Sequence, residues 1–286
     1  MIICICGPTG VGKTRVSEFI AEKLNGIIIN ADATQIYKNL NIGSAKITKE
    51  EMKVQEHYLF DIKSPNEDYS VMNYQNDARK ILNKNKNKNI IVVGGTGLYI
   101  KSLFYDYKFF EKKEENYDNL TNHELYLLAK QKDINFPLHE NNRVRLINFL
   151  NRERQTFNKD KLLYNVIFIG LTTERKTIYS LCDKRVDNMM KKGLLKETTY
   201  LYKKYPESKI LKRAIGYKEL IEYLKGNETL ENAIENIKKN TRHYVKRQYT
   251  WFNNQLNLNW FNIDIENFSK TENEIYEFIK KTGKDN

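Results

Sequence analysis

Cysteines and long apolar runs are scarce in this sequence. Its 286 residues include three cysteines, Cys4, Cys6 and Cys182, and no CxxC pair. This argues against a disulfide framework and against a cysteine-based zinc site, so we expect a reducing, cytoplasmic environment. The sequence contains no run of 18 or more apolar residues, so no membrane span is predicted. The first ten residues also lack the basic start and the cleavage site of a signal peptide, so no membrane partner is expected.

Acidic residues are fewer than basic ones. The chain has 48 Lys and Arg residues against 36 Asp and Glu residues, which gives a formal net charge of +12. A basic protein usually has an anionic partner, and nucleic acid is the commonest large one. Lysine and asparagine are spread along the whole chain, however, so the charge is informative only where it gathers on one element.

Four short apolar segments predict the strands of a buried parallel sheet. They lie at residues 2–6, 27–30, 90–93 and 166–171. A helix with one apolar stripe is predicted between the first two strands, over residues 14–24. Strands that alternate with helices and end at glycine are typical of a doubly wound α/β fold, in which ligands bind beyond the carboxyl ends of the strands.

The segment 108–161 differs from the rest of the chain. It is charged and aromatic with helical spacing, and Thr121 with Glu124 predicts a capping box at a helix start. We interpret it as a small helical insertion between a first part of the core, residues 1–107, and a second part, residues 162–286. The second part is expected to be mostly helical after its strand.

A phosphate-binding motif of the form GxxxxGK[ST] stands between the first strand and the first helix. It consists of Gly7, Pro8, Thr9, Gly10, Val11, Gly12, Lys13 and Thr14. In such a loop the backbone N–H groups converge on phosphate oxygens, Lys13 adds a positive charge, and Thr14 offers a hydroxyl to Mg²⁺. The motif predicts a phosphate site but does not identify the phosphate.

A carboxylate, Asp32, follows the second predicted strand. At that place it can be a Mg²⁺ ligand, a general base or a helix N-cap. The third strand, in contrast, runs into Gly94 without the acidic residue that a P-loop ATPase uses for Mg²⁺. This absence argues against an ordinary ATP-hydrolysing motor.

Positive charge gathers on a predicted helix near the C-terminus. Its basic residues are Lys238, Lys239, Arg242, Lys246 and Arg247. Two aromatic residues, Tyr249 and Trp251, follow directly. Basic residues interleaved with aromatic ones suit phosphate contacts combined with base stacking, although a solvated cationic face has the same composition.

Taken together, the motifs resemble the tRNA dimethylallyltransferase family, also called tRNA isopentenyltransferases. In order along the chain, they read GPTGVGKT, DATQIYKNLNIGSAK, HYLFDI, YSVMNYQNDA, VVGGTGLYIKSL, HENNRVR, IGLTTER, RVDNMMKKGLLKE, RAIGYKEL and TRHYVKRQYTWF. The resemblance covers nearly the whole chain, and GGTGLYIK, IGYKEL and KRQxTWF are individually distinctive. The chain looks like the bacterial form, since no zinc-finger extension follows.

The resemblance implies a P-loop NTPase-like α/β core, a parallel sheet flanked by helices, with the insertion clasping the anticodon stem of tRNA. It implies transfer of a five-carbon prenyl group from dimethylallyl diphosphate to the exocyclic amine of an adenine beside the anticodon. Mg²⁺ is the implied cofactor. We expect a monomer, because nothing in the sequence demands a dimer.

The resemblance also assigns roles to residues. The motif from Gly7 to Thr14 would hold the diphosphate, with Thr14 at the metal. Lys13, Thr14 and Arg185 would assist the leaving group, and Asp32 would be the general base. The residues implied in tRNA binding are Asp32, Ala33, Thr34, Gln35, Thr96, Arg145, Arg213, Gly216, Tyr217, Lys218, Arg242, Lys246, Arg247 and Gln248.

Two positions depart from the family pattern. Ala33 stands where a serine is common, and Asn148 where an arginine is common. Three alternatives also stay open: an adenylate prenyltransferase acting on free nucleotide, a small-molecule kinase with ATP in the loop, and an RNA-binding NTPase without transferase activity. The adenylate enzyme should not need the basic helix, and the kinase leaves GGTGLYIK unexplained.

Overall fold

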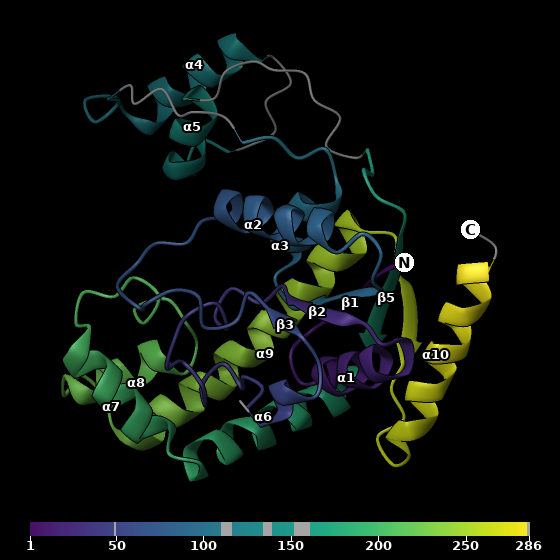
Figure 1. The fold of residues 1–286 in the computed structure, drawn as a ribbon. Coiled ribbons are helices and arrows are strands. Elements are labelled where there is room, and N and C mark those ends of the chain that lie inside the picture. The colour runs from purple at the N-terminus through teal and green to yellow at the C-terminus, as the bar shows by residue number, and fades with distance from the viewer. Residues whose placement is uncertain (49, 110–115, 134–138, 152–160, 285–286) are drawn as a thin grey trace. The chain divides into compact units, whose positions relative to one another are not determined.

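The chain forms two compact units in a computed structural model, which describes residues 1–48, 50–109, 116–133, 139–151 and 161–284. The first unit contains Met1–Tyr105 and Leu162–Asn286, and the second contains Asp106–Lys161 (Figure 1). The second unit thus interrupts the first in sequence.

A six-stranded parallel sheet forms the centre of the first unit. Its strands are β1 Ile2–Cys6, β2 Ile27–Asn30, β3 His57–Tyr58, β4 Ile90–Gly94, β5 Val166–Thr172 and β6 Asn259–Asn262. Their order across the sheet is β3-β2-β4-β1-β5-β6, and every pairing is parallel. The α/β prediction is therefore confirmed.

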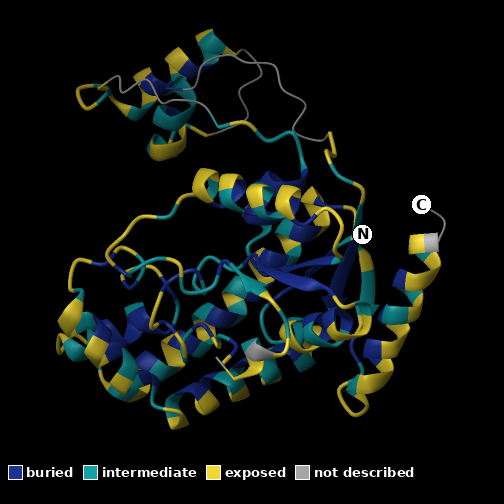
Figure 2. Cartoon of the chain, viewed as in Figure 1, coloured by how far each residue is buried: buried dark blue, intermediate teal, exposed yellow. Residues whose placement is uncertain are grey.

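Helices cover both faces of the sheet. They are α1 Lys13–Leu24, α2 Val71–Lys84, α3 Gly97–Phe104, α6 Arg175–Lys191, α7 Leu194–Lys204, α8 Tyr217–Leu224, α9 Leu230–Gln255 and α10 Phe268–Lys284, with a 3₁₀ helix at Glu51–Lys53. Figure 2 shows the central strands buried and the helices exposed on their outer sides. Among the residues that the structure describes, no helix is long and apolar enough to cross a membrane.

The side chains of β1 show how the two faces are built. Ile3 and Ile5 belong to one buried cluster with residues of α1, α6 and α10. Cys4 and Cys6 belong to another, with residues of α2, α3 and α9. Successive residues of a strand point to opposite faces, so a continuous apolar run is buried on both sides. The two cysteines lie on the same face and do not form a disulfide.

The second unit contains α4 Asn122–Lys132 and α5 Arg143–Leu150. Thr121 accepts a hydrogen bond from the Glu124 backbone, and the Glu124 carboxylate accepts one from the Thr121 backbone. The predicted capping box is therefore confirmed, and such a cap stabilises a helix by about 1 kcal/mol. The small core of the unit is formed by Leu125, Ala129 and Leu146.

Candidate active site

The glycine-rich loop connects β1 to α1 at the carboxyl edge of the sheet. Gly12 is the N-cap of α1 and has a φ of 82°, a left-handed conformation that favours glycine. A Cβ at this position would also lie 2.4 Å from the Phe268 ring of α10. Because α1 begins at Lys13 without a side-chain cap, the N–H groups of its first turn remain available to an anion in the loop.

Lys13 is held inside this loop. Its Nζ donates a hydrogen bond to the Pro8 carbonyl at 2.7 Å. Burial lowers the pKa of Lys13 to about 8, an effect that Asp32 opposes and Arg185 strengthens. An anion bound beside Nζ would offset the cost of burying this charge and raise the pKa again.

Asp32 lies just beyond the end of β2 in a fixed orientation. Its Oδ1 accepts hydrogen bonds from the Thr34 backbone at 3.0 Å and from the Thr34 hydroxyl at 2.5 Å. The Asn30 side chain donates to the Asp32 carbonyl and accepts from its N–H. Residues 31–40 are all described and contain no helix, so the interpretation of Asp32 as a helix N-cap is wrong.

Arg185 of α6 supplies the second cation. Burial lowers the pKa of its guanidinium, and the Asp32 carboxylate opposes this effect. One guanidinium nitrogen donates to the Ser44 carbonyl at 3.4 Å. Two cations, Lys13 and Arg185, thus lie close enough to one carboxylate, Asp32, for their charges to interact.

Two cavities meet at this charged group. The first has a volume of about 360 Å³ and lies over the phosphate loop. The second, of about 330 Å³, extends along α6, residues 210–218 and α9. The residues that line both are Thr9, Lys13, Asp32, Ser44 and Arg185. A reaction between a ligand in one cavity and a ligand in the other would therefore take place beside these three charges.

The residues predicted to bind tRNA are distributed as follows. Those that line the second cavity are Asp32, Ala33, Thr34, Thr96, Arg213, Gly216, Lys218, Arg247 and Gln248. Gln35 lines the first cavity. The other four are Arg145, which belongs to the second unit, Tyr217, which is buried, Arg242, which pairs with Asp183 at 2.6 Å, and Lys246, which is exposed on α9. These roles stay predictions.

Gln248 has a structural task that the sequence did not suggest. Its Oε1 accepts a hydrogen bond from the Thr9 backbone at 3.0 Å, and its Nε2 donates to the Gly95 carbonyl at 2.9 Å. The side chain is buried. It therefore joins the phosphate loop to the loop after β4. A second bond, from the Ala33 backbone to the Thr96 hydroxyl at 3.0 Å, joins the loops after β2 and β4.

Sequence reasoning missed part of the lining of the second cavity. Met189 and Tyr244 both face it. Met189 lies four residues after Arg185 on α6, and Tyr244 lies four residues before Gln248 on α9. A helix places residues with this spacing on one face. Once Arg185 and Gln248 were predicted to lie in the site, the spacing could therefore have indicated Met189 and Tyr244 as well.

A magnesium ion fits the first cavity only with help from a substrate. Among the described residues, no group of three or more His, Cys, Asp or Glu side chains could hold a metal. Mg²⁺ in phosphate-transfer sites usually has one or two protein ligands and takes the others from phosphate and water. Thr14, exposed in the first turn of α1, and Asp32 both line this cavity and offer oxygen atoms of the right kind.

A phosphate loop on a parallel sheet, facing two cations and a carboxylate, defines a P-loop enzyme that acts on a phosphate-containing substrate. The sequence pattern of the IPP transferase family matches residues 35–255. The chain belongs to this family, and the resemblance in its motifs is confirmed.

Relatives and solved structures agree with this assignment. The chain is similar to tRNA dimethylallyltransferase of Anoxybacillus flavithermus, with 41% identity over 98% of this chain and 96% of the relative. The chain is also similar to tRNA dimethylallyltransferase of Bacillus subtilis, with 39% identity over 92% of this chain and 90% of the relative. The structure of tRNA delta(2)-isopentenylpyrophosphate transferase from Staphylococcus epidermidis is 35% identical, with a TM-score of 0.77 over 98% of this chain and 99% of that one.

Proposed function

We propose that this protein transfers the dimethylallyl group of dimethylallyl diphosphate to the exocyclic amine of an adenine beside the anticodon of tRNA. The observation that carries the proposal is the wall of Lys13, Asp32 and Arg185 shared by the two cavities. A two-substrate transfer needs such a place, where donor and acceptor meet between groups of opposite charge. The enzyme would act as a monomer on the anticodon stem-loop.

The donor diphosphate would lie in the first cavity, against the N–H groups of the loop from Gly7 to Thr14. Lys13 and Arg185 would neutralise the negative charge that grows on the diphosphate as it departs. Thr14 would contribute a hydroxyl to Mg²⁺, which supplies further charge stabilisation on the phosphate oxygens when it is bound. The pKa of Lys13, lowered by burial to about 8, would rise on binding, so donor and proton bind cooperatively.

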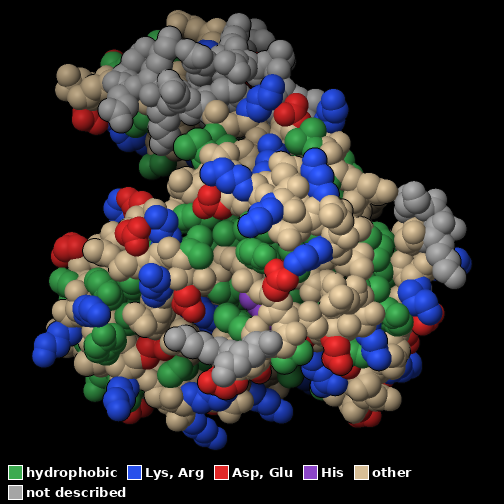
Figure 3. All heavy atoms as spheres, in the orientation of Figure 1, with side chains coloured by type: hydrophobic (Ala, Val, Ile, Leu, Met, Phe, Trp, Pro, Cys, Tyr) green, Lys and Arg blue, Asp and Glu red, His purple; other side chains and the backbone are tan. Residues whose placement is uncertain are grey.

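The acceptor adenine would enter the second cavity, whose basic residues Arg213, Lys218 and Arg247 suit an RNA backbone. An adenine must leave its stack to reach this depth, which is inexpensive in an anticodon loop. On the face shown in Figure 3, Lys and Arg side chains are spread among Asp and Glu rather than gathered in one patch. The local basic lining of the cavity is therefore a better guide to the partner than the net charge.

In the reaction, the amine nitrogen forms a bond to the allylic carbon while the bond from that carbon to the diphosphate oxygen breaks. The amine proton passes to the Asp32 carboxylate, which Thr34 and Asn30 hold in place. A positioned base of this kind contributes about 10²- to 10⁴-fold to the rate. The proton becomes acidic only as the new bond forms, so a carboxylate can accept it.

The test is incubation of the purified protein with dimethylallyl diphosphate, Mg²⁺ and either tRNA or AMP, followed by mass spectrometry. We expect the mass of one prenyl group on tRNA and none on AMP. Prenylation of AMP alone would favour the adenylate enzyme, and ATP turnover without RNA would favour an NTPase.

A pair of matched variants tests the role of Asp32. Asp32→Asn should lose turnover and keep tRNA affinity. Asp68→Asn removes an exposed carboxylate that pairs with Lys209 outside the site, and it should behave like the wild type. Full turnover by Asp32→Asn would overturn its assignment as the base.

A further inference from the structure

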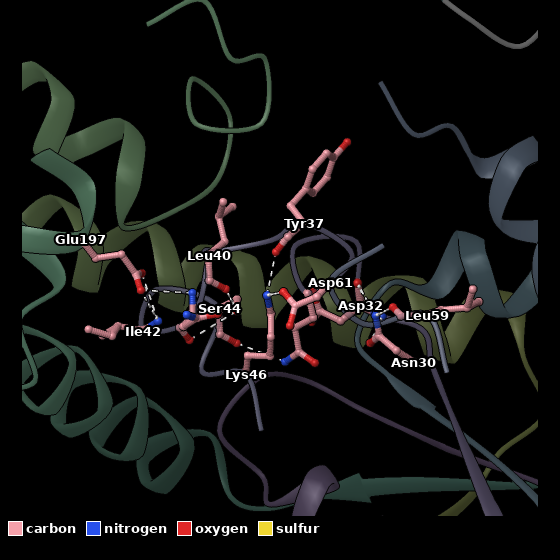
Figure 4. A network of polar contacts seen from close by, with 12 residues as sticks. Asn30, Asp32, Tyr37, Leu40, Ile42, Ser44, Lys46, Leu59, Asp61 and Glu197 are labelled. Carbon is pink, nitrogen blue, oxygen red and sulfur yellow. Dashed lines mark hydrogen bonds and ion pairs between the residues drawn. The ribbon is translucent and has the colours of Figure 1, made fainter. Parts of the chain in front are cut away.

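A loop without regular secondary structure, residues 39–46, lies between α7 and the charged group formed by Lys13, Asp32 and Arg185. Its backbone N–H groups need partners, because unpaired polar groups are costly away from water. The Glu197 carboxylate of α7 accepts hydrogen bonds from three successive N–H groups: Asn41 at 3.1 Å, Ile42 at 3.0 Å and Gly43 at 3.2 Å. Figure 4 shows Glu197 directed at this part of the loop. One side chain thus fixes the backbone of three residues.

Glu197 is itself fixed by Tyr217 of α8. The Tyr217 hydroxyl donates to Glu197 Oε1 at 2.7 Å, and its fully buried ring packs against Gly43. A carboxylate has about four acceptor positions, and three N–H groups with one hydroxyl occupy them. Glu197 therefore has no capacity for a substrate or metal, and its task is to hold the loop.

The far end of the loop is fixed by a second charged residue. The Lys46 ammonium donates to the Tyr37 carbonyl and to the Asp61 carboxylate, each at 2.6 Å. Its side chain is 2% exposed. Both anchors are visible in Figure 4 on either side of Ser44. The residue between the two anchors is thereby restrained from both directions.

Ser44 connects the restrained loop to the charged group. Its carbonyl accepts hydrogen bonds from the Arg185 guanidinium at 3.4 Å and from the Gln35 amide at 3.2 Å. Its hydroxyl donates to the Leu40 carbonyl at 2.5 Å, which keeps the turn closed. Ser44 also lines both cavities. A shift of its carbonyl would move Arg185 relative to Asp32.

We propose that Glu197 is a positioning residue for the transfer reaction, acting through the Ser44 carbonyl on Arg185. The inference rests on the proposed function, because the consequence of a misplaced Arg185 is slower departure of diphosphate. A displacement of about 1 Å at a reacting group can cost up to about 100-fold in rate. Glu197 would achieve this effect without contacting either substrate.

Glu197→Gln is the informative substitution because it keeps the size of the side chain. One carboxylate oxygen becomes an NH₂ donor, which faces backbone N–H donors and leaves at least one of them unpaired. We expect kcat to fall by about 10- to 100-fold while KM for tRNA stays unchanged. The matched control, Glu222→Gln, removes an exposed carboxylate of α8 that pairs with Lys225, and it should leave kcat unchanged.

A double-mutant cycle separates positioning from simple loss of stability. If Glu197 acts through Arg185, Glu197→Gln should have no further effect on kcat in an Arg185→Ala background. Affinity for inorganic diphosphate, measured by calorimetry in the same four proteins, gives the same comparison where turnover is too slow to measure. Melting temperatures show whether each variant is folded.

Either of two results would overturn the inference: a Glu197→Gln enzyme with wild-type kcat per folded molecule, or losses that multiply in the double mutant. A purely structural Glu197 would lower the melting temperature and leave kcat of the folded fraction intact. Absence of prenyl transfer by the wild-type protein is a different outcome, since it refutes the proposed function before the cycle begins.

Discussion

Lys13→Met should make the protein inactive and more stable at neutral pH. Burial lowers the pKa of Lys13 from 10.5 to about 8, and each pKa unit corresponds to about 1.4 kcal/mol. The charged ammonium therefore costs the folded state about 3 kcal/mol at pH 7. Methionine keeps the apolar part of the side chain but cannot donate a hydrogen bond to the Pro8 carbonyl. The loss of this bond reduces the gain in stability by about 1 kcal/mol. The expected net gain is about 2 kcal/mol.

The pH dependence of this gain is the sharper test. The folded pKa lies below the unfolded one, so between pH 8 and pH 10.5 the unfolded wild-type chain binds more protons than the folded one. Wild-type stability therefore rises relative to Lys13→Met in this window. Urea unfolding of both proteins at pH 7 and pH 10 should show the gap shrinking by about 2 kcal/mol. A gap independent of pH, or a less stable variant at pH 7, would refute the reasoning.

Three further predictions concern residues around the site. Gln248→Ala should lower the free energy of unfolding by about 2 to 4 kcal/mol, measured in urea, because it leaves the backbone groups of two loops unpaired. Thr34→Val should lower kcat by about tenfold by freeing Asp32, whereas Thr34→Ser, which keeps the hydroxyl, should not. Burial disfavours the His57 imidazolium, but bonds to Glu18 and to a backbone carbonyl outweigh it and raise the pKa of His57. That stabilisation is complete below pH 6.5 and lost as pH rises through the folded pKa, so Glu18→Gln should destabilise the protein more at pH 6 than at pH 9.

The core of the fold could be predicted because its strands are continuous apolar runs that end at glycine or at a polar residue. The strands β3 and β6 could not be predicted in this way. β3 has two residues, and β6 reads NWFN, with exposed asparagines at both ends. A strand at the edge of a sheet needs little apolar sequence, because it is paired on one side only. Whether an edge strand forms depends on the strand beside it, and the local sequence pattern does not show which strand that will be.

The phosphate loop and Asp32 could be found because each stands directly after a strand, where the parallel sheet brings them together. The residues that hold them could not be found in the same way. Glu197 lies 153 residues beyond Ser44 in helix α7, whose other charged residues are all lysines. Its role depends on three backbone N–H groups, and a sequence carries no signal for the direction of a loop backbone. The resemblance assigned Gln248 to tRNA binding, whereas its side chain joins two loops through their backbone groups. The direction of those backbone groups is likewise not encoded in a readable sequence signal.

The missing acidic residue after β4 has a physical explanation in the packing of this edge. β4 ends at Gly94, where a Cβ would lie 2.2 Å from the backbone of Ala31. The next carbonyl, that of Gly95, is already bonded to Gln248 of α9. An acidic side chain therefore has no room at the position from which a P-loop ATPase binds its metal. Because α9 also lines the second cavity, the helix whose Gln248 occupies this edge of the sheet also forms part of the wall of that cavity. The carboxylate that lines both cavities is instead Asp32, just beyond the end of the neighbouring strand β2, which is the place that the proposed reaction requires of its base.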